Sequence, residues 1–131
     1  MVYGLSVSFN RARSTVRGFL MEIFFKNKKL AEIFNTQKEL YKSYGKNIGD
    51  VIKRRMAVLA AAPTLAEVSH KPPERRHELQ GKRIGEFAVD LDRRYRLVLK
   101  PEHNPLPRKE DEGLDLKKIT AVTILGVEDY H

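Results

Sequence analysis

The chain of 131 residues contains no cysteine, which excludes disulfide bonds and any zinc or iron–sulfur site with thiolate ligands. It also has no apolar run long enough to cross a bilayer as a helix. The first residues, VYGLSVSFNRARSTVR, mix apolar side chains with Ser, Asn and Arg, unlike the continuous apolar core of a signal peptide. We therefore expect a soluble, cytoplasmic protein with no membrane partner.

Motifs of several common enzyme classes are missing as well. No HExxH pair and no close set of histidines and carboxylates is present, so we expect no metal ion and no other cofactor. The lack of a GxxxxGKS/T loop argues against nucleotide hydrolysis. The lack of a GxSxG turn argues against an α/β-hydrolase.

Positive charge is in clear excess, with 25 Lys and Arg against 17 Asp and Glu and a formal net charge of +8. Such an excess favours a polyanionic partner, which can be a nucleic acid, an anionic membrane or an acidic protein. The alternative is a basic domain without such a partner. The length corresponds to one domain, and 41% hydrophobic residues are enough to build its core.

The first half of the chain predicts helices after one short strand. MEIFF, at residues 21–25, is typical of a strand, and apolar residues then recur every three or four positions up to residue 62. Thr36 and Glu39 have the spacing of a capping box. Gly45 is expected to separate two helices, and Pro63 to end the second.

The second half changes to a period of two, which predicts strands at RHEL, EFAVDL and YRLVLK. The turns between them are too short for a parallel crossover, so these strands should be antiparallel neighbours. The segment KKITAVTILGV is apolar on both faces and predicts a central strand. The result is an α+β fold with helices on one face of a small antiparallel sheet. Residues 1–20 differ in pattern and are expected to form a loosely held extension or an extra edge strand, outside a compact domain of residues 21–131.

Two of the four histidines lie where proton transfer is plausible. His77 stands in RRHELQGKR, within a dense cluster of cations, and His131 follows Asp129 and Tyr130 at the end of the last strand. His70 and His103 are interpreted instead as a helix-end residue and a solvated loop residue. His77 and His131 also have simpler interpretations. His77 can be a structural histidine, and His131 can be a frayed terminal residue.

Together these side chains suit the cleavage of RNA. A base takes the proton of the ribose 2′-hydroxyl, an acid protonates the leaving 5′ oxygen, and cations stabilise the crowded phosphate. Histidine titrates near neutrality and arginine binds two phosphate oxygens at once. The residues available for this chemistry are His77, Asp129, Tyr130, His131, Arg96, Lys82 and Arg83.

The same stretches, RRHELQGKRIGEFAVDLDRRYRLVLKP and the final VEDYH, resemble the HigB-type toxins of the RelE/ParE superfamily. The resemblance covers residues 21–131. It implies a microbial-ribonuclease-like (RelE-like) fold, with two or three helices against a curved antiparallel sheet. It also implies an endoribonuclease toxin of a type II toxin–antitoxin pair, which cleaves mRNA in the ribosomal A site and inhibits translation. A helix-turn-helix antitoxin would be its cognate partner.

By this resemblance His77, Asp129, Tyr130 and His131 are the catalytic candidates, and Arg96 is a phosphate-binding candidate. Arg76, Lys82 and Arg83 are added as RNA-binding candidates from the cation cluster around His77. The family usually has Lys-Gly-Asp-Arg in the turn after H-x-L, whereas this chain has Gln80-Gly81-Lys82-Arg83. The first lysine is therefore lost, and Lys82 stands in place of the aspartate.

Two other functions stay open from the sequence. A ParE-like protein would poison DNA gyrase by binding, and it would need neither His77 nor His131. A non-catalytic RNA-binding module would usually stack bases on aromatic residues, and few aromatics are interleaved with the basic segments here. If His131 acts in the site, even a short C-terminal tag should reduce activity.

Overall fold

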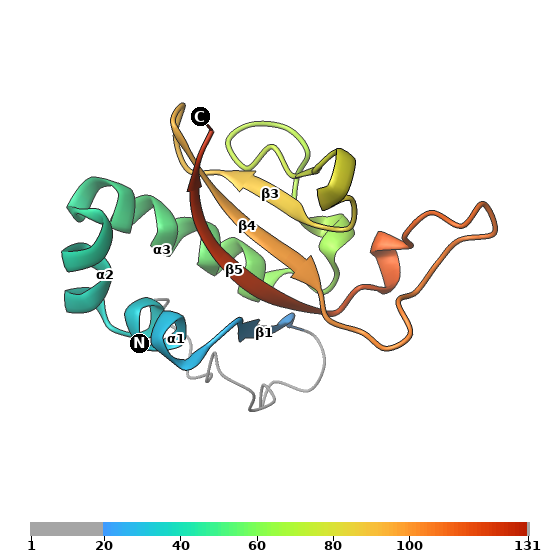
Figure 1. The fold of residues 1–131 in the computed structure, drawn as a ribbon, viewed down its shortest axis with the longest axis horizontal. Coiled ribbons are helices and arrows are strands. Elements are labelled where there is room, and N and C mark those ends of the chain that lie inside the picture. Colours follow the sequence, from blue (N-terminus) through green and yellow to red (C-terminus); the bar gives the residue numbers. More distant parts are fainter. Residues whose placement is uncertain (1–19, 131) are drawn as a thin grey trace.

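The computed structural model describes residues 20–130. The expectations for the N-terminal extension before residue 20 and for His131 lie outside these residues. The described chain is α+β, with three α-helices and a five-stranded sheet (Figure 1). No helix within residues 20–130 is long and apolar enough to cross a membrane.

Three consecutive helices follow the first strand. They are α1 (Lys28–Asn35), α2 (Gln37–Tyr44) and α3 (Lys46–Ala61). The Asn27 side chain accepts a hydrogen bond from the backbone N–H of Leu30 at 2.9 Å and so caps α1. Gly45 separates α2 from α3 as predicted, with a φ of +83°.

The predicted capping box at Thr36 does not form. Thr36 precedes α2 without a side-chain cap bond, and its hydroxyl instead donates to the carbonyl oxygen of Glu32 at 3.3 Å. Because α1 ends one residue earlier, an unpaired carbonyl of its last turn is within reach of this hydroxyl.

The strands form one sheet in the order β1-β5-β4-β3-β2. They are β1 (Glu22–Phe25), β2 (His77–Glu78), β3 (Phe87–Asp90), β4 (Tyr95–Pro101) and β5 (Ala121–Asp129). The strand predicted to be central, β5, does lie inside the sheet between β1 and β4, but it is second from the edge and not in the middle.

The expectation of a purely antiparallel sheet is wrong, since β1 runs parallel to β5. The other neighbouring pairs are antiparallel, as their short connections require. The turn-length argument applied only to strands that follow each other closely. Between β1 and β5 lies most of the chain, including the three helices, so no short turn fixes their relative direction.

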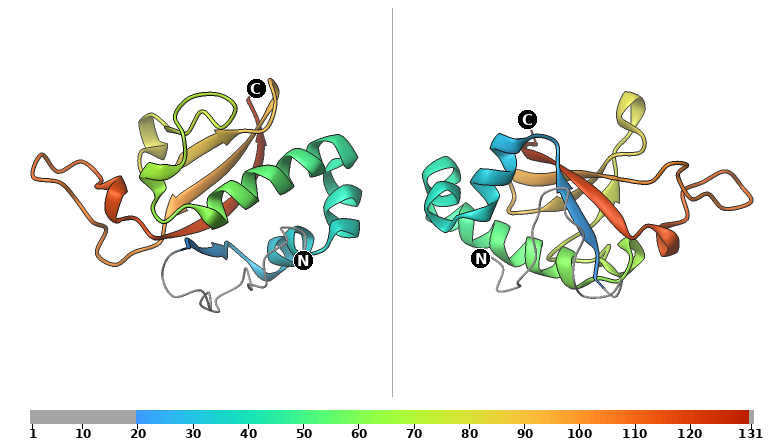
Figure 2. Two further views of the ribbon diagram at one scale, coloured as in Figure 1. Left: turned by 180° about the vertical axis from the view of Figure 1, so that it is seen from behind. Right: turned by 90° about the horizontal axis from the view of Figure 1, so that it is seen from below.

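The helices pack on one face of the sheet, with α3 lying across it (Figure 2). Phe34, Leu40, Ile52 and Met56 of the helices are fully buried with Leu97 and Leu99 of β4. On the opposite face, Leu79, Ala88 and Val98 form a second, smaller buried cluster. Side chains alternate between the faces of a strand, so the register assigns every other residue to the helix-free face.

That helix-free face carries the polar residues of interest. Asp90 of β3 is paired with Arg96 of β4, which is in turn paired with Glu128 of β5. His77 of β2 is paired with Ala88, two residues before Asp90. One row of charged side chains therefore crosses three strands at the end of the sheet where the β3–β4 turn lies.

Candidate active site

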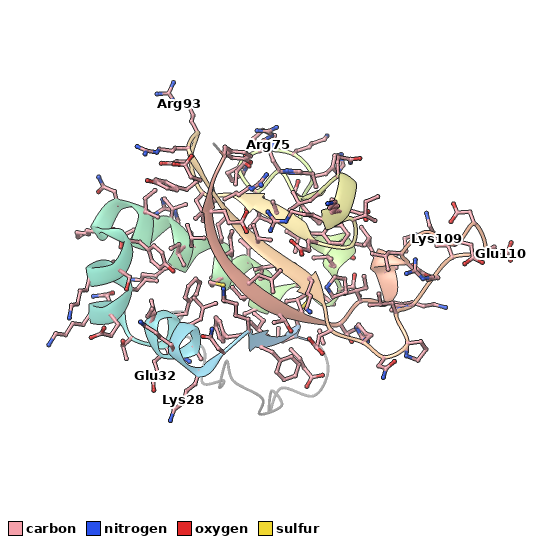
Figure 3. All side chains as sticks on the ribbon, viewed as in Figure 1. Lys28, Glu32, Arg75, Arg93, Lys109 and Glu110 are labelled. Atoms are coloured by element: carbon pink, nitrogen blue, oxygen red, sulfur yellow. The ribbon has the colours of Figure 1, made fainter. Side chains whose placement is uncertain are left out.

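An open hollow of about 350 Å³ lies at this end of the sheet. It is lined by His70, Arg75, Arg76, His77, Arg93 and Tyr130. The lining comes from the connector before β2, from the first residue of β2, from the β3–β4 turn and from the residue after β5. Figure 3 shows Arg75 and Arg93 at this same end of the molecule. The fold thus brings His77 and Tyr130, which are far apart in the sequence, to one basic hollow.

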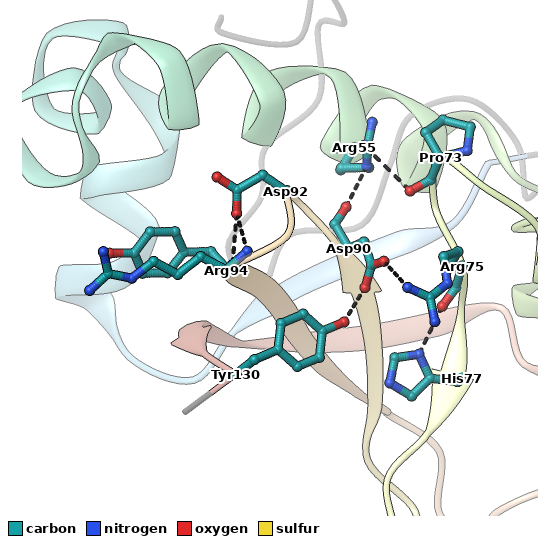
Figure 4. A network of polar contacts seen from close by, with 9 residues as sticks. Arg55, Pro73, Arg75, His77, Asp90, Asp92, Arg94 and Tyr130 are labelled. Atoms are coloured by element: carbon teal, nitrogen blue, oxygen red, sulfur yellow. Dashed lines mark hydrogen bonds and ion pairs between the residues drawn. The ribbon is translucent and has the colours of Figure 1, made fainter.

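Tyr130 is fixed at three points although it lies beyond β5. Its backbone N–H donates to the carbonyl oxygen of Arg94 at 2.8 Å. The guanidinium of Arg96 lies 4.9 Å from the centroid of its ring, a cation–π contact. Its hydroxyl donates a hydrogen bond to the carboxylate of Asp90 (Figure 4). The phenol is therefore held in place by neighbouring strands.

Asp90 is the centre of this network. Its side chain is only 12% exposed, and its second carboxylate oxygen accepts from Arg75 Nη1 at 2.8 Å. Its backbone carbonyl accepts from Nε of the buried Arg55 of α3 at 2.6 Å. A buried carboxylate is stable only when its oxygens have such partners. Asp90 thus joins the helix layer, the connector before β2 and the end of the chain.

Burial and the Asp90 carboxylate together keep Tyr130 protonated. Burial, the hydrogen bond to Asp90 and its negative charge raise the pKa of Tyr130 to about 12. Each of these effects disfavours the phenolate. At neutral pH the side chain is therefore an uncharged phenol whose proton lies towards Asp90.

His77 has a defined tautomer in its neutral form. Its Nδ1 lies 2.8 Å from the backbone carbonyl oxygen of Arg75. A carbonyl only accepts hydrogen bonds, so Nδ1 must carry a proton and Nε2 is left as the acceptor. Since the ring lines the hollow, His77 can take up a proton from a bound molecule or, when charged, donate one.

The cations predicted to bind RNA have different environments. Arg76 lines the hollow, and its Nε donates to the carbonyl oxygen of Val68 at 2.9 Å. Burial lowers the pKa of Arg76. Arg96 lies beneath Tyr130 with an 18% exposed side chain, so it supports the phenol more than it faces solvent. Lys82 is exposed and does not line the hollow.

Arg83 is bound by two carboxylates of the protein itself. Its guanidinium binds Glu128 through two nitrogens, each at 2.7 Å, and also pairs with Glu86 at 2.7 Å. These bonds raise the pKa of Arg83 and lower that of Glu128. Arg83 therefore ties the turn after β2 to β5, and it does not line the hollow.

Asp129 also lies outside the lining of the hollow. Its carboxylate pairs with Nε of Arg94 at 3.0 Å, on the β3–β4 turn. Asp129 and Tyr130 thus have different surroundings, as expected of consecutive residues at a strand end.

Several residues in or next to the hollow have no assigned role in the sequence interpretation. Asp90 and Arg93 were read as parts of a strand and a turn, Arg75 only as one cation of a cluster, and His70 as a helix-end residue. The available signal was an acidic residue at the end of the apolar run FAVD, but its partners come from distant parts of the chain.

Within residues 20–130, no three histidine, aspartate or glutamate side chains gather in a way that could hold a metal ion. Searches of the chain against family models, curated proteins and solved structures found no significant match.

Proposed function

We propose that this protein is an endoribonuclease that cleaves RNA by attack of a ribose 2′-hydroxyl on the neighbouring phosphate. More narrowly, we propose that it is the toxin of a type II toxin–antitoxin pair, with a RelE-like fold, that cleaves mRNA in the ribosomal A site. Its partners would be the ribosome and a helix-turn-helix antitoxin. The chemistry is supported by the hollow, whereas the toxin assignment is supported by the sequence resemblance.

One observation carries the proposal: His77 and Tyr130 line the same hollow as three arginines. Arg75, Arg76 and Arg93 provide positive charge where a phosphate would enter. Arginine is suited to this because its planar guanidinium can bind two phosphate oxygens. An imidazole beside such a cluster combines the proton transfer and the charge stabilisation that phosphodiester cleavage uses.

The reaction balances without an external reactant. A base removes the 2′-hydroxyl proton, O2′ bonds to phosphorus, and the bond from phosphorus to O5′ breaks while an acid protonates O5′. The products are a 2′,3′-cyclic phosphate and a free 5′-hydroxyl. His77 performs one of the two proton transfers through Nε2. The other we assign to His131, the second histidine candidate from the sequence, and the arginines stabilise the charge on the phosphate.

The test compares two histidine variants. We expect His77→Ala to reduce cleavage at least about hundredfold, the usual scale of a lost general acid or base. His103→Ala is the matched control, because His103 lies in the loop after β4, where Nε2 accepts from the Thr120 N–H at 3.0 Å, away from the hollow. The measurement is mapping of mRNA 5′ ends after expression from a tightly repressed promoter.

New 5′ ends within translated frames, present in the wild type and His103→Ala but lost in His77→Ala, are the expected result. Growth arrest with intact mRNA would contradict the nuclease. In that case labelled thymidine and methionine incorporation would test the gyrase poison, which should stop replication before translation.

A further inference from the structure

The hollow contains an apparent contradiction. Its lining is basic and suits a phosphate, yet the carboxylate of Asp90 lies directly behind Tyr130. A negative charge near a phosphate site weakens anion binding, and Asp90 also occupies one nitrogen of Arg75, a residue of the lining. If the hollow only had to bind phosphate, Asp90 would be a disadvantage.

The donors and acceptors around Asp90 indicate what its carboxylate does. An ionised carboxylate only accepts hydrogen bonds, and a guanidinium only donates them. One carboxylate oxygen accepts from Arg75 and the other from Tyr130, so the single phenolic proton of Tyr130 is directed to Asp90. The lone pairs of the phenolic oxygen are then left for a donor. Tyr130 thus presents an acceptor to the hollow that it lines.

A ribose is the sugar that can supply this donor. The 2′-hydroxyl donates and accepts hydrogen bonds, whereas deoxyribose has no group there and a 2′-fluoro sugar has no proton to donate. We infer that Asp90 is a positioning residue that keeps Tyr130 a hydrogen-bond acceptor, so that the site prefers nucleic-acid strands whose sugars carry a 2′-hydroxyl. The inference rests on the proposed function, since it takes single-stranded RNA as the ligand.

Replacing Asp90 by asparagine should reverse this polarity while keeping the shape. Asparagine has one oxygen and one NH₂ group, and Arg75 can pair only with the oxygen. The NH₂ group must then face Tyr130 and donate to it. The phenol is left with its own proton turned towards the hollow, so that Tyr130 becomes a donor there. The sugar then no longer has to supply a proton, and the advantage of a 2′-hydroxyl over a 2′-fluoro group is reduced.

The experiment measures binding of three single strands of one sequence, with 2′-hydroxyl, 2′-fluoro or 2′-deoxy sugars, by fluorescence anisotropy. Titrations use His77→Ala protein so that the RNA stays intact. We expect the protein to prefer the 2′-hydroxyl strand about fivefold, the usual worth of one hydrogen bond. In Asp90→Asn the preference for 2′-hydroxyl over 2′-fluoro should shrink, because Tyr130 no longer needs a donor from the sugar. The 2′-fluoro strand should bind at least as tightly as before, because a carboxylate beside the basic hollow is lost.

Asp92→Asn is the control for charge. Asp92 lies in the β3–β4 turn, where its carboxylate accepts from the backbone N–H groups of Arg94 and Tyr95 at 2.8 and 2.7 Å. It makes the same change in charge close to the hollow without touching Tyr130, so the preference should persist. Tyr130→Phe removes the acceptor itself and should abolish the preference for the 2′-hydroxyl strand. This variant tests the inference even if Asp90→Asn does not fold.

A structural role for Asp90 would give a different result, because affinity for all three strands would fall and their ratio would stay. That outcome, or equal binding of the three strands by the protein with Asp90 and Tyr130 intact, would overturn the inference. Failure to bind any of the strands would also overturn it. The 5′-end mapping judges the proposed nuclease separately, so a nuclease indifferent to Asp90→Asn would leave the proposed function standing without this inference.

Discussion

At the scale of single residues, surroundings decide what a charged group can do. Arg75 precedes β2 and Arg83 follows it, yet Arg75 lines the basic hollow while Arg83 is bound by two carboxylates. The N–H groups of Arg83 already donate to Glu128 and Glu86, and a phosphate would have to displace Glu128 to reach them. We therefore expect Arg83 to contribute to stability more than to RNA binding.

This role can be measured through the pH dependence of Glu128→Gln. Hydrogen bonds from Arg83 lower the pKa of Glu128 below its ordinary value of 4.5, so this stabilisation is complete above that pH and is lost as pH falls through the folded-state pKa. Because both side chains are about one-third exposed, we expect Glu128→Gln to cost only about 1 kcal/mol at pH 7.

The measurement is urea unfolding at a series of pH values, and the difference between the two proteins should shrink below pH 4.5. The exposed Glu110, in the loop far from the hollow, gives the control Glu110→Gln, which should change little (Figure 3). A gap between wild type and Glu128→Gln that stays constant down to acid pH would show that the carboxylate charge is not the cause.

At the scale of elements, the connector before β2 matters more than its lack of regular structure suggests. It supplies His70, Arg75 and Arg76 to the hollow, and β2 itself has only two residues. The connector is nevertheless fixed by backbone hydrogen bonds, from Arg76 N–H to Ser69 at 2.9 Å and from Asp90 N–H to Glu74 at 2.7 Å. A site on such a loop is positioned by the sheet edge to which the loop is bonded.

The junction of α2 and α3 depends on one glycine. Gly45 has φ +83° and ψ 161°, a region of backbone conformation that side chains rarely adopt, while no atom lies within 4 Å of where its Cβ would be. Gly45→Ala should therefore destabilise the protein by about 1–3 kcal/mol through backbone strain alone. Urea unfolding measures this, with Ser43→Ala in the preceding turn of α2 as the control. A neutral Gly45→Ala would show that the junction relaxes.

At the scale of the whole molecule, the net charge of +8 acts together with the basic hollow. Long-range attraction brings a polyanion to the surface, and local geometry then orients it. The general charge does not explain Asp90, which places a negative group directly beside the basic hollow.

The charge predicts a salt dependence for RNA binding. If three arginines of the hollow neutralise about three phosphates of a single strand, affinity should fall about twentyfold between 50 and 200 mM salt. Anisotropy titrations with a short RNA at several salt concentrations test this, and Arg93→Gln should reduce the slope by about 0.7. Binding indifferent to salt would rule out phosphate contacts as its main source.

Local patterns in the sequence were sufficient for most of the fold. The period of 3.6 residues predicted the helices, the period of two predicted β3 and β4, and an apolar run on both faces predicted the inner strand β5. The effects of Gly45 and Pro63 could be predicted, because each residue acts on the backbone at its own position. The parallel pairing of β1 with β5 could not be predicted, since it joins segments with most of the chain between them.

The candidate site also has features that the sequence predicts and features that only the tertiary structure shows. The sequence by itself determined that His77 and Tyr130 were candidates and that the surface was basic, because these are properties of residue type and position along a strand. Only the tertiary structure decided that Asp90 lies between Arg75 and Tyr130, and that Glu128 binds Arg83. Those contacts follow from strand register, which places residues distant in the chain within hydrogen-bond range, and no local pattern encodes that register.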